Sequence, residues 1–415
     1  MKTVGIIAEY NPFHNGHAYH IRKAKELTGA DYCIVVMSGD FVQRGAPAMM
    51  DKYLRTRIAL MNGADLVLEL PAYYALGSAE YFAGGAVTLL DKLGVVDNLC
   101  FGSECGDVEL LTTFARLLLH EDEVFKQTLD QCLRDGHSYP QARNAAIEAS
   151  APHLTAHTNI LSNPNNILGI EYCKALLKRE SAVRPCTIRR TGAAYHDESM
   201  YADFCSARAL REALKCSDTP GSILNQMPAA AHPLMKEQYL KTYPVFADDL
   251  SLLMHYRLLS EPSGEFTCYP DIDRELSDRI IKLLPQYQDF PSFCDLLKSK
   301  NRTYTRISRS LLHILLEIYR EDLACYLAKD QIFYARMLGF RESAGPLLSA
   351  IKQKTAVPLL SKLADAGNLL TPTGMHMLEK DIYASHVYQS IVRYKFADQN
   401  TISEINEYKE AIIKV

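Results

Sequence analysis

Short apolar runs alternate with amphipathic segments through the first half of the 415-residue chain. The runs are brief and rich in β-branched residues, which is typical of strands buried on both faces of a sheet. They are residues 4–8, 32–37, 65–70, 98–102 and 187–190. The segments between them, such as 51–62 and 79–93, repeat apolar positions with the helical period. This alternation predicts an α/β fold with a parallel, Rossmann-like sheet.

The second half of the chain has a different pattern. From residue 216 onward, apolar residues recur almost everywhere at helical spacing, and Pro220-Gly221 interrupts the chain just after that point. A chain of this length is expected to form two domains. We therefore expect an α/β domain in residues 1–215 and a mostly α-helical domain in residues 216–415.

Composition places the chain among ordinary globular proteins. Hydrophobic residues make up 48% and charged residues 23%, and no stretch is long and apolar enough for a membrane span. The N-terminal apolar run stops at Glu9, unlike a signal peptide. Eleven cysteines are scattered without a Cys-x-x-Cys pair, which indicates reduced thiols in a cytoplasmic protein. Because the net charge is −4, a nucleic-acid partner would need local basic patches.

Several charged positions interrupt this pattern. Glu69 lies inside the third apolar run, and a buried carboxylate needs a partner. Asp51 is a candidate N-cap for the helix predicted at 51–62. We expect Arg55 and Arg57 of that helix to be solvated, although either could reach a phosphate.

The turn after the first strand contains candidate chemistry. Residues 11–12 (Asn-Pro) end the strand, because the residue before a proline avoids helical conformations, and residues 18–27 have helical character. Between them stand His14, Gly16 and His17. A helix N-terminus attracts phosphate groups, and a glycine allows a ligand close to the backbone. The turn therefore indicates phosphate binding, although both histidines could also be ordinary structural residues.

The spacing of His14, His17 and His20 could instead suggest a metal site. Zinc sites usually add cysteine or carboxylate ligands, and none stands at matching spacing here. The sequence therefore assigns no metal ligand.

Polar residues follow other predicted strands at the same edge of the sheet, where doubly wound folds bind their ligands. Residues 38–40 (Ser-Gly-Asp) follow the second strand, and residues 102–104 (Gly-Ser-Glu) follow the fourth. The segment 41–48 is either a plain loop or a wall of a substrate site. Ser206 either caps a helix that reaches residue 215 or faces phosphates together with arginines of that helix.

Two basic runs could contact phosphate or RNA. Residues 298–309 contain five cations, an aromatic residue and no acid, which suits contacts with a nucleic-acid backbone and a base. A solvated helix start explains the run equally well. The candidates are Lys298, Lys300, Arg302, Tyr304, Arg306 and Arg309. A second cluster, with Glu180 as its one acid, comprises Lys174, Lys178, Arg179, Arg184, Arg189 and Arg190.

Five segments, in order and spacing, resemble the bacterial tRNA(Met) cytidine acetate ligase family. They are residues 8–17, 37–45, 63–71, 101–104 and 162–165, with a looser match at 302–306 and 336–340. The first segment contains the H-x-G-H signature of the nucleotidyltransferase superfamily. The resemblance implies that ATP and acetate form acetyl-adenylate and pyrophosphate. The N4 amine of the wobble cytidine (position 34) of elongator tRNA(Met) would then attack the acetyl carbon, giving N4-acetylcytidine and AMP.

The resemblance also implies roles for individual residues. His14 and His17 would be catalytic and stabilise the triphosphate, to which Mg²⁺ would be bound. Asp40, Gln43 and Arg44 would form a substrate loop near acetate, and the run 298–309 would contact tRNA. The residues implied in ATP binding are Ile7, Ala8, Glu9, Tyr10, Asn11, Pro12, Phe13, His14, Asn15, Gly16, His17, Ala18, Tyr19, His20, Gly102, Asn163, Arg189, Arg190, Ser206 and Arg211.

The chain departs from the family pattern at three positions. Asp40 replaces an asparagine or histidine, Ala46 replaces a glutamate, and Arg208 replaces the threonine of the second nucleotidyltransferase signature. An extra carboxylate at position 40 would be unfavourable beside acetate unless it is paired. The Lys-Met-Ser-Lys-Ser segment of ordinary aminoacyl-tRNA synthetases is absent. The alternatives are a small-molecule nucleotidyltransferase and a non-catalytic RNA-binding protein on the same fold.

Overall fold

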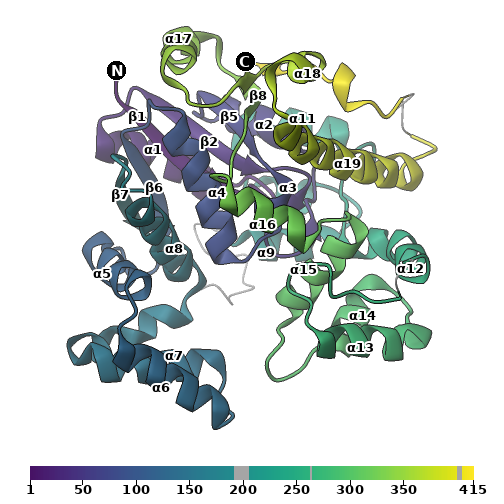
Figure 1. Cartoon of the computed structure of the whole chain (residues 1–415). Coiled ribbons are helices and arrows are strands. Elements are labelled where there is room, and N and C mark those ends of the chain that lie inside the picture. Colours follow the sequence, from purple (N-terminus) through teal and green to yellow (C-terminus); the bar gives the residue numbers. More distant parts are fainter. Residues whose placement is uncertain (191–204, 262–263, 400–403) are drawn as a thin grey trace.

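The computed structural model describes residues 1–190, 205–261, 264–399 and 404–415. In these residues an eight-stranded sheet has the order β10-β8-β5-β2-β1-β6-β7, with β9 paired to β8 (Figure 1). The strands are β1 Thr3–Ala8, β2 Tyr32–Ser38, β5 Leu66–Leu70, β6 Asn98–Ser103, β7 Arg184–Arg189, β8 Ala335–Phe340, β9 Leu359–Leu360 and β10 Ile413–Lys414. All five predicted strands are present and pair in parallel with one another. The predicted α/β fold is confirmed.

The C-terminal half is mostly helical, as expected, but it also contributes strands. β8, β9 and β10 come from this half and join the sheet of the first half. β8 runs antiparallel to β5 and places Arg336 opposite Glu69. Arg336 and Gly339 weaken the strand pattern in the sequence, and the pairing with β5 overrides this weak local preference. The division at residue 215 stays a prediction, since strands from both sides of it share one sheet.

Helices cover both faces of the sheet and extend beyond it (Figure 1). Those of the first half are α1 Asn15–Thr28, α2 Lys52–Met61, α3 Ala72–Ala75, α4 Ala79–Lys92, α5 Val108–Leu119, α6 Glu123–Arg134, α7 Tyr139–Ser150, α8 Pro164–Lys178 and α9 Ala207–Lys215. Those of the second half are α10 Gly221–Leu224, α11 His232–Gln238, α12 Ser251–Leu259, α13 Arg274–Leu283, α14 Phe290–Leu297, α15 Tyr304–Leu315, α16 Arg320–Ala328, α17 Gly345–Lys354, α18 Ala366–Leu369 and α19 Pro372–Lys395.

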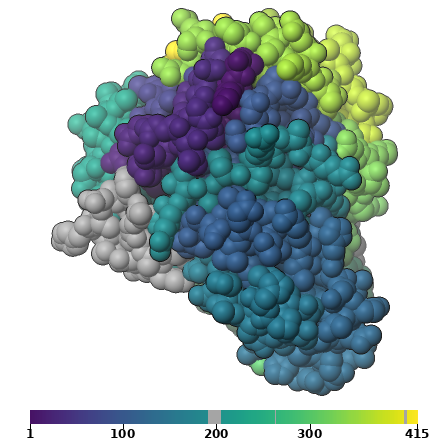
Figure 2. Space-filling view, turned by 90° about the vertical axis from the view of Figure 1, so that its left-hand side faces the viewer, coloured from purple at the N-terminus to yellow at the C-terminus, as the bar shows by residue number. Residues whose placement is uncertain are grey.

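Two helical groups extend away from the sheet. Figure 1 shows α5–α7 and α12–α15 below it, on opposite sides of the molecule. In the space-filling view, residues coloured as α5–α7 form a lobe at the lower end (Figure 2). No helix in the described part of the chain has the length and apolar character needed to cross a bilayer.

Two hydrophobic cores lie on opposite faces of the sheet. Along β2, Cys33, Val35 and Met37 pack into the core beneath α1 and α2. Ile34 and Val36 pack into the other core, beneath α4 and α8. Side chains alternate between the two faces of a strand, so a strand covered on both faces reads as a continuous apolar run. This burial explains why the sequence pattern identified the central strands.

The predicted helix caps at Asp51 and Ser206 are confirmed. The Asp51 carboxylate accepts hydrogen bonds from the backbone N–H groups of Tyr53 at 2.9 Å and Leu54 at 2.8 Å, at the start of α2. The Ser206 hydroxyl accepts a hydrogen bond from the Ala209 N–H at 3.1 Å, at the start of α9. These bonds satisfy N–H groups that have no partner within a helix. Residues 191–204, which precede this cap, lie outside the described residues.

A buried network of charges joins the two halves of the chain. Glu69 on β5 lies 3.0 Å from the Lys52 ammonium and 2.9 Å from the Arg336 guanidinium. Glu407, near the C-terminus, lies 2.5 Å from each of these two cations. All four side chains are at most 4% exposed. Glu69 therefore has the partners that its burial requires, one from each half of the chain.

Asp40 lies at the edge of this network, which corrects its predicted place in a substrate loop. One carboxylate oxygen accepts a hydrogen bond from the backbone N–H of Lys52 at 2.8 Å, and the other accepts one from the Ser385 hydroxyl at 3.0 Å. The residue is 3% exposed. Burial raises the pKa of Asp40 to about 6, and the Lys52 charge opposes this rise. The side chain supports the fold and does not line the pocket described below.

The Asp40→Asn variant is expected to change how stability depends on pH. A carboxyl group whose pKa rises from its ordinary ~3.9 to about 6 on folding binds its proton more tightly in the folded chain. Its contribution to the free energy of unfolding is therefore largest below about pH 4 and is lost as the pH rises through 6.

Urea unfolding of both proteins between pH 4 and pH 7 measures this effect. The stability of the wild-type protein relative to D40N should fall by roughly 2–3 kcal/mol across this range. Other titrating groups are common to both proteins and cancel in the difference. A difference in stability between the two proteins that does not change with pH would contradict the raised pKa of Asp40.

Candidate active site

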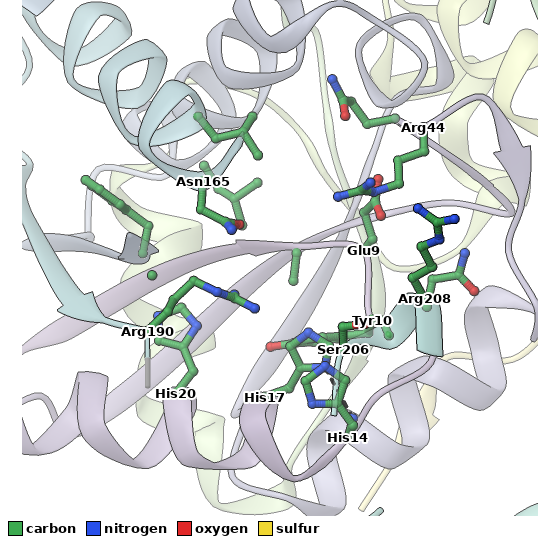
Figure 3. Close-up of a pocket in the computed structure, with 18 of the residues that line it drawn as sticks. Glu9, Tyr10, His14, His17, His20, Arg44, Asn165, Arg190, Ser206 and Arg208 are labelled. Atoms are coloured by element: carbon green, nitrogen blue, oxygen red, sulfur yellow. Dashed lines mark hydrogen bonds between the residues drawn. The ribbon is translucent and has the colours of Figure 1, made fainter. Parts of the chain in front are cut away.

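A pocket opens at the carboxyl ends of β1 and β6, beside the first turns of α1 (Figure 3). The β1–α1 turn, the hairpin of β3 (Phe41–Val42) and β4 (Ala46–Pro47), and the starts of α8 and α9 contribute to its wall. The lining residues are Ile7, Ala8, Glu9, Tyr10, Asn11, His14, His17, His20, Gln43, Arg44, Phe82, Phe101, Gly102, Asn165, Leu168, Tyr172, Arg190, Ser206, Ala207, Arg208 and Arg211.

The pocket brings together most of the residues predicted for ATP binding and for the substrate loop. The members of these two sets that do not line it are Pro12, Phe13, Asn15, Gly16, Ala18, Tyr19, Asp40, Asn163 and Arg189. The predicted tRNA-contact residues in 298–309 do not line it either. Phe13 instead packs in the core, where its ring lies 4.8 Å from that of Tyr10. The turn therefore supplies ligand-facing side chains and also the residues that hold them in place.

His14 and His17 form a stacked pair at the N-terminus of α1. His14 Nδ1 accepts a hydrogen bond from the Gly16 N–H at 3.1 Å, and His17 Nδ1 accepts one from the His14 N–H at 3.2 Å. The ring centroids are 3.8 Å apart. Because both Nδ1 atoms accept, a neutral ring carries its proton on Nε2. Each histidine therefore caps the helix with one nitrogen and keeps an N–H donor on the other.

The three pocket histidines are neutral at ordinary pH. Burial lowers the pKa of His14 to about 3, and the Arg190 charge adds to this effect. Burial is the main cause that holds the pKa of His17 well below its ordinary range, and the neighbouring His14 lowers this pKa further. Burial and Arg190 lower the pKa of His20 to about 4. Neutral rings can donate hydrogen bonds to a phosphate without first binding a proton.

Four arginines among the described residues give the pocket a positive character. Arg44 comes from the hairpin, Arg190 from the end of β7, and Arg208 and Arg211 from α9. Arg208, where the family signature has threonine, therefore adds a cation to the site. Arg211 donates a hydrogen bond to the Asn11 carbonyl at 2.5 Å, which ties α9 to the β1–α1 turn. This concentration of cations suits a polyanionic ligand.

Two polar atoms at the pocket have no hydrogen-bond partner among the described residues. They are His20 Nε2 and the Tyr10 hydroxyl, both of which are buried. A buried polar group without a partner is unfavourable. Atoms of a bound ligand could satisfy both groups.

Arg189 and Arg190 are adjacent in sequence but have different surroundings. Arg190 lines the pocket, whereas the Arg189 side chain lies against Gly106 and does not line it. Successive side chains of a strand point to opposite faces, and these residues follow that rule at the end of β7. Of the two adjacent arginines implied in ATP binding, Arg190 therefore lines the pocket and Arg189 does not.

Asn165 occupies the place predicted for Asn163. The Asn165 side-chain amide donates to Glu104 at 2.6 Å, and Glu104 also accepts from the Asn166 N–H at 2.8 Å. Asn166 in turn accepts from the Glu104 N–H at 2.9 Å. These reciprocal bonds lock the end of β6 to the start of α8. Asn163 donates to the Asn159 carbonyl at 3.4 Å, outside the pocket.

A helical spacing could have identified the missed residues of α8. Asn165, Leu168 and Tyr172 are three and four residues apart, so they lie on one face of the helix and line the pocket together. Phe82 and Phe101, also missed, give no local signal that separates them from ordinary core residues.

The β3–β4 hairpin forms a wall of the site, in agreement with one of the two interpretations of residues 41–48. Gln43 and Arg44 line the pocket from its tip. Gly45 has φ +77°, and an added Cβ would come within 2.5 Å of the Arg309 backbone nitrogen. The Ser308 hydroxyl also donates to the Gly45 carbonyl. Helix α15 of the second half therefore fixes the hairpin.

Arg55 is buried, so the expectation that it is solvated is wrong. Its guanidinium donates to the carbonyl oxygens of Glu9 at 2.7 Å and Ser38 at 3.0 Å, and also to that of Gly39. Its Nε donates to the Met50 carbonyl at 2.9 Å. The side chain thus joins the carboxyl ends of β1 and β2. The apolar pattern could not reveal this role because the partners are backbone carbonyls.

The basic run 298–309 is largely neutralised by acids. Arg302 lies 2.9 Å from Asp273 and 2.8 Å from Glu275, and Arg309 lies 3.3 Å from Asp271. Arg302 and Arg309 are buried, so their guanidinium groups support the fold. Lys298 lies 3.0 Å from Asp295, and Arg306 donates to the Asp271 carbonyl at 3.5 Å. Of the other two candidates, Tyr304 is half-buried and Lys300 is exposed. Contact of this run with tRNA stays a prediction.

The second basic cluster contains similar internal pairs. Lys174 lies 3.0 Å from Glu171 and 3.2 Å from Glu80. Arg179 lies 3.1 Å from Asp91 and 2.8 Å from Asp330. Among its members, Arg190 is the one that lines the pocket.

Fold and site together define a nucleotidyltransferase. A parallel sheet presents an H-x-G-H turn at a helix N-terminus, and arginines line the same pocket. The model of the HIGH Nucleotidyl Transferase family matches residues 1–403.

Full-length relatives specify the family within this class. The tRNA(Met) cytidine acetate ligase of Clostridium kluyveri is 40% identical over 402 residues, which cover 94% of this chain and 98% of that protein. The protein of the same name from Acetivibrio thermocellus is 38% identical over 392 residues, with 94% of each chain covered. The chain belongs to the tRNA(Met) cytidine acetate ligase family.

Two crystal structures of Thermotoga maritima TmcAL have the same fold. The apo form matches with a TM-score of 0.92 at 31% identity and covers 100% of both chains. The form bound with alpha-thio ATP matches with a TM-score of 0.87 at 32% identity, and the match covers 94% of this chain and 95% of that one. The similarity therefore extends through both halves of the chain.

Arg55→Met is expected to destabilise the protein. The variant removes the donors to four carbonyl oxygens, three of them at the carboxyl ends of β1 and β2. We expect a loss of about 3–5 kcal/mol in the free energy of unfolding, measured with urea. The control is Arg57→Met, at an exposed position on the same helix, which should change stability by less than about 0.5 kcal/mol. Equal losses in the two variants would contradict the role of Arg55.

Proposed function

We propose that this chain is an ATP-dependent acetate ligase that modifies elongator tRNA(Met). It converts ATP and acetate to acetyl-adenylate and pyrophosphate, and then acetylates N4 of the wobble cytidine (position 34) to give N4-acetylcytidine. The observation that carries the proposal is the pair of neutral, stacked histidines at the start of α1, in a pocket lined by arginines. The names of the relatives support acetate and tRNA(Met) as substrates, and the ATP analogue bound to T. maritima TmcAL supports ATP.

In the first step, an acetate oxygen attacks the α-phosphorus of ATP and pyrophosphate leaves. Negative charge develops on the phosphate oxygens as the transition state forms. His14 and His17 each offer an Nε2–H donor, and the N-terminus of α1 adds a favourable dipole. Burial keeps both rings neutral, so the donors are ready without a change in protonation.

The pocket arginines hold the anionic substrates. The phosphate and carboxylate oxygens can pair with the guanidinium groups of Arg44, Arg190, Arg208 and Arg211. A bound carboxylate commonly accepts two hydrogen bonds from one guanidinium. We place acetate beside the hairpin that carries Gln43 and Arg44. Mg²⁺ arrives bound to the triphosphate, since the described lining provides a single carboxylate.

In the second step, N4 of the cytidine attacks the acetyl carbon and AMP leaves. The tRNA reaches the pocket from outside. Because Arg302 and Arg309 are buried, the cations of the basic run that can contact tRNA are Lys298, Lys300 and Arg306. Such an enzyme works in the cytoplasm, where tRNA is modified.

One experiment separates this proposal from its alternatives. The protein is incubated with ATP, labelled acetate and either elongator tRNA(Met) or another tRNA. The proposal predicts label in RNA with elongator tRNA(Met) alone. Pyrophosphate release without labelled RNA would favour a small-molecule nucleotidyltransferase, and an absence of ATP turnover would favour a non-catalytic RNA-binding protein.

His17→Ala and His17→Asn test the role of the histidine donor. Both variants remove the Nε2–H, but an asparagine side chain can still accept the hydrogen bond from the His14 N–H. We expect both to lower acetate-dependent exchange between ATP and pyrophosphate by about 10²–10³-fold, with tRNA affinity unchanged. Normal exchange in H17N would mean that His17 acts only as a helix cap.

Arg190→Ala and Arg189→Ala form a matched pair that tests whether Arg190 contacts the nucleotide. Arg190 lines the pocket and Arg189 does not, although both substitutions remove the same charge from adjacent positions. We expect R190A to weaken ATP binding about 10-fold or more in calorimetric titrations, and R189A to leave it unchanged. Equal weakening in both variants would show that overall charge, and not a contact in the pocket, holds the nucleotide.

A further inference from the structure

Glu9 is unusual in this pocket because it is the only acidic residue among the described residues that line it. It stands at the end of β1, and Figure 3 shows it on the same side of the pocket as Arg44 and Arg208, away from Arg190 and His20. Its carboxylate makes no hydrogen bond or ion pair with any residue that the structure describes. The steps described above leave this group without a function.

The backbone holds Glu9 in a fixed place. Its carbonyl oxygen accepts a hydrogen bond from the Arg55 guanidinium at 2.7 Å. The next residue, Tyr10, has φ +49°, a left-handed conformation that is rare for residues other than glycine, and its ring is buried against Phe13 and His17. Such strained residues persist only where their surroundings enforce them, and they concentrate at functional sites.

Charge argues against the contact with ATP that the family resemblance implies for Glu9, and equally against a contact with acetate. ATP and acetate are both anions, and a nearby carboxylate weakens the binding of each by repulsion. The third substrate is different, because a cytosine base is neutral and presents the N4 amino group as a hydrogen-bond donor. Carboxylates are the usual acceptors for this group in recognition of cytosine. The chemistry of Glu9 therefore fits the acceptor base.

We propose that Glu9 is a catalytic base for acetyl transfer to the cytidine, an inference that rests on the proposed function. N4 forms a bond to the acetyl carbonyl carbon, and the bond between that carbon and the adenylate oxygen breaks. AMP leaves with the electron pair of the broken bond, and Glu9 takes the proton that N4 loses. The lone pair of an aromatic amine is delocalised into its ring, so removal of this proton as the new bond forms assists the attack.

The two half-reactions provide a direct test with the full-length protein. Acetate-dependent exchange between ATP and pyrophosphate reports adenylate formation without tRNA. Transfer is measured as labelled acetyl in RNA during a single turnover at saturating elongator tRNA(Met). Glu9→Gln preserves the shape of the side chain and removes the base. Glu212→Gln is the control, since Glu212 is an exposed acid on α9, next to the pocket residue Arg211.

We expect E9Q to lower the transfer rate about 10²–10⁴-fold and to keep exchange within about twofold of the wild-type rate. E212Q should leave both rates unchanged. Equal loss of exchange and transfer in E9Q would overturn the inference and assign Glu9 to Mg²⁺ or nucleotide binding. Normal transfer, or a defect confined to tRNA affinity, would overturn it as well. Failure of the wild-type protein to exchange pyrophosphate with acetate would contradict the proposed function instead.

Discussion

Buried cations on α2 hold the active-site edge of the sheet together. Arg55 donates to backbone carbonyls after both β1 and β2, where the pocket begins. Lys52, on the same helix, pairs with Glu69 and with Glu407 near the C-terminus. A buried charge that loses its partners costs several kcal/mol, so these contacts require that the strands, α2 and the C-terminal segment fold as one unit. The second half of the chain thus supports a site to which the first half supplies the lining residues.

The pocket combines this rigidity with a specific electrostatic arrangement. Neutral histidines cap α1 and present donors, and arginines approach from α9, β7 and the hairpin. Among the described residues of the lining, a single carboxylate stands on the hairpin side. Such preorganised donors and charges suit a reaction in which phosphate oxygens gain negative charge, because little reorganisation is needed as the reaction proceeds. The hairpin itself is fixed by α15, which makes the helical half part of the site's architecture.

The sequence predicted the features that depend on local patterns. The five central strands, the caps at Asp51 and Ser206 and the turn at His14 each follow from neighbouring residues. It could not predict features that depend on distant partners. β8 has a weak strand pattern of its own, and its pairing depends on β5, where Glu69 lies opposite Arg336. The cations at 302 and 309 are paired with acids on other segments of the chain. Arg190 and Asn165 differ from their neighbours Arg189 and Asn163 only in the face that each element turns toward the pocket.

The central claim is that this site activates acetate as an adenylate. It can be tested with acetate labelled with ¹⁸O on both oxygens, together with ATP and elongator tRNA(Met), by mass spectrometry of the AMP produced. Attack of an acetate oxygen on the α-phosphorus, followed by cleavage of the bond between the acetyl carbon and that oxygen, leaves one ¹⁸O atom in AMP. The account therefore predicts AMP that carries a single ¹⁸O for each acetyl group transferred. Unlabelled AMP accompanied by acetylated tRNA would contradict it.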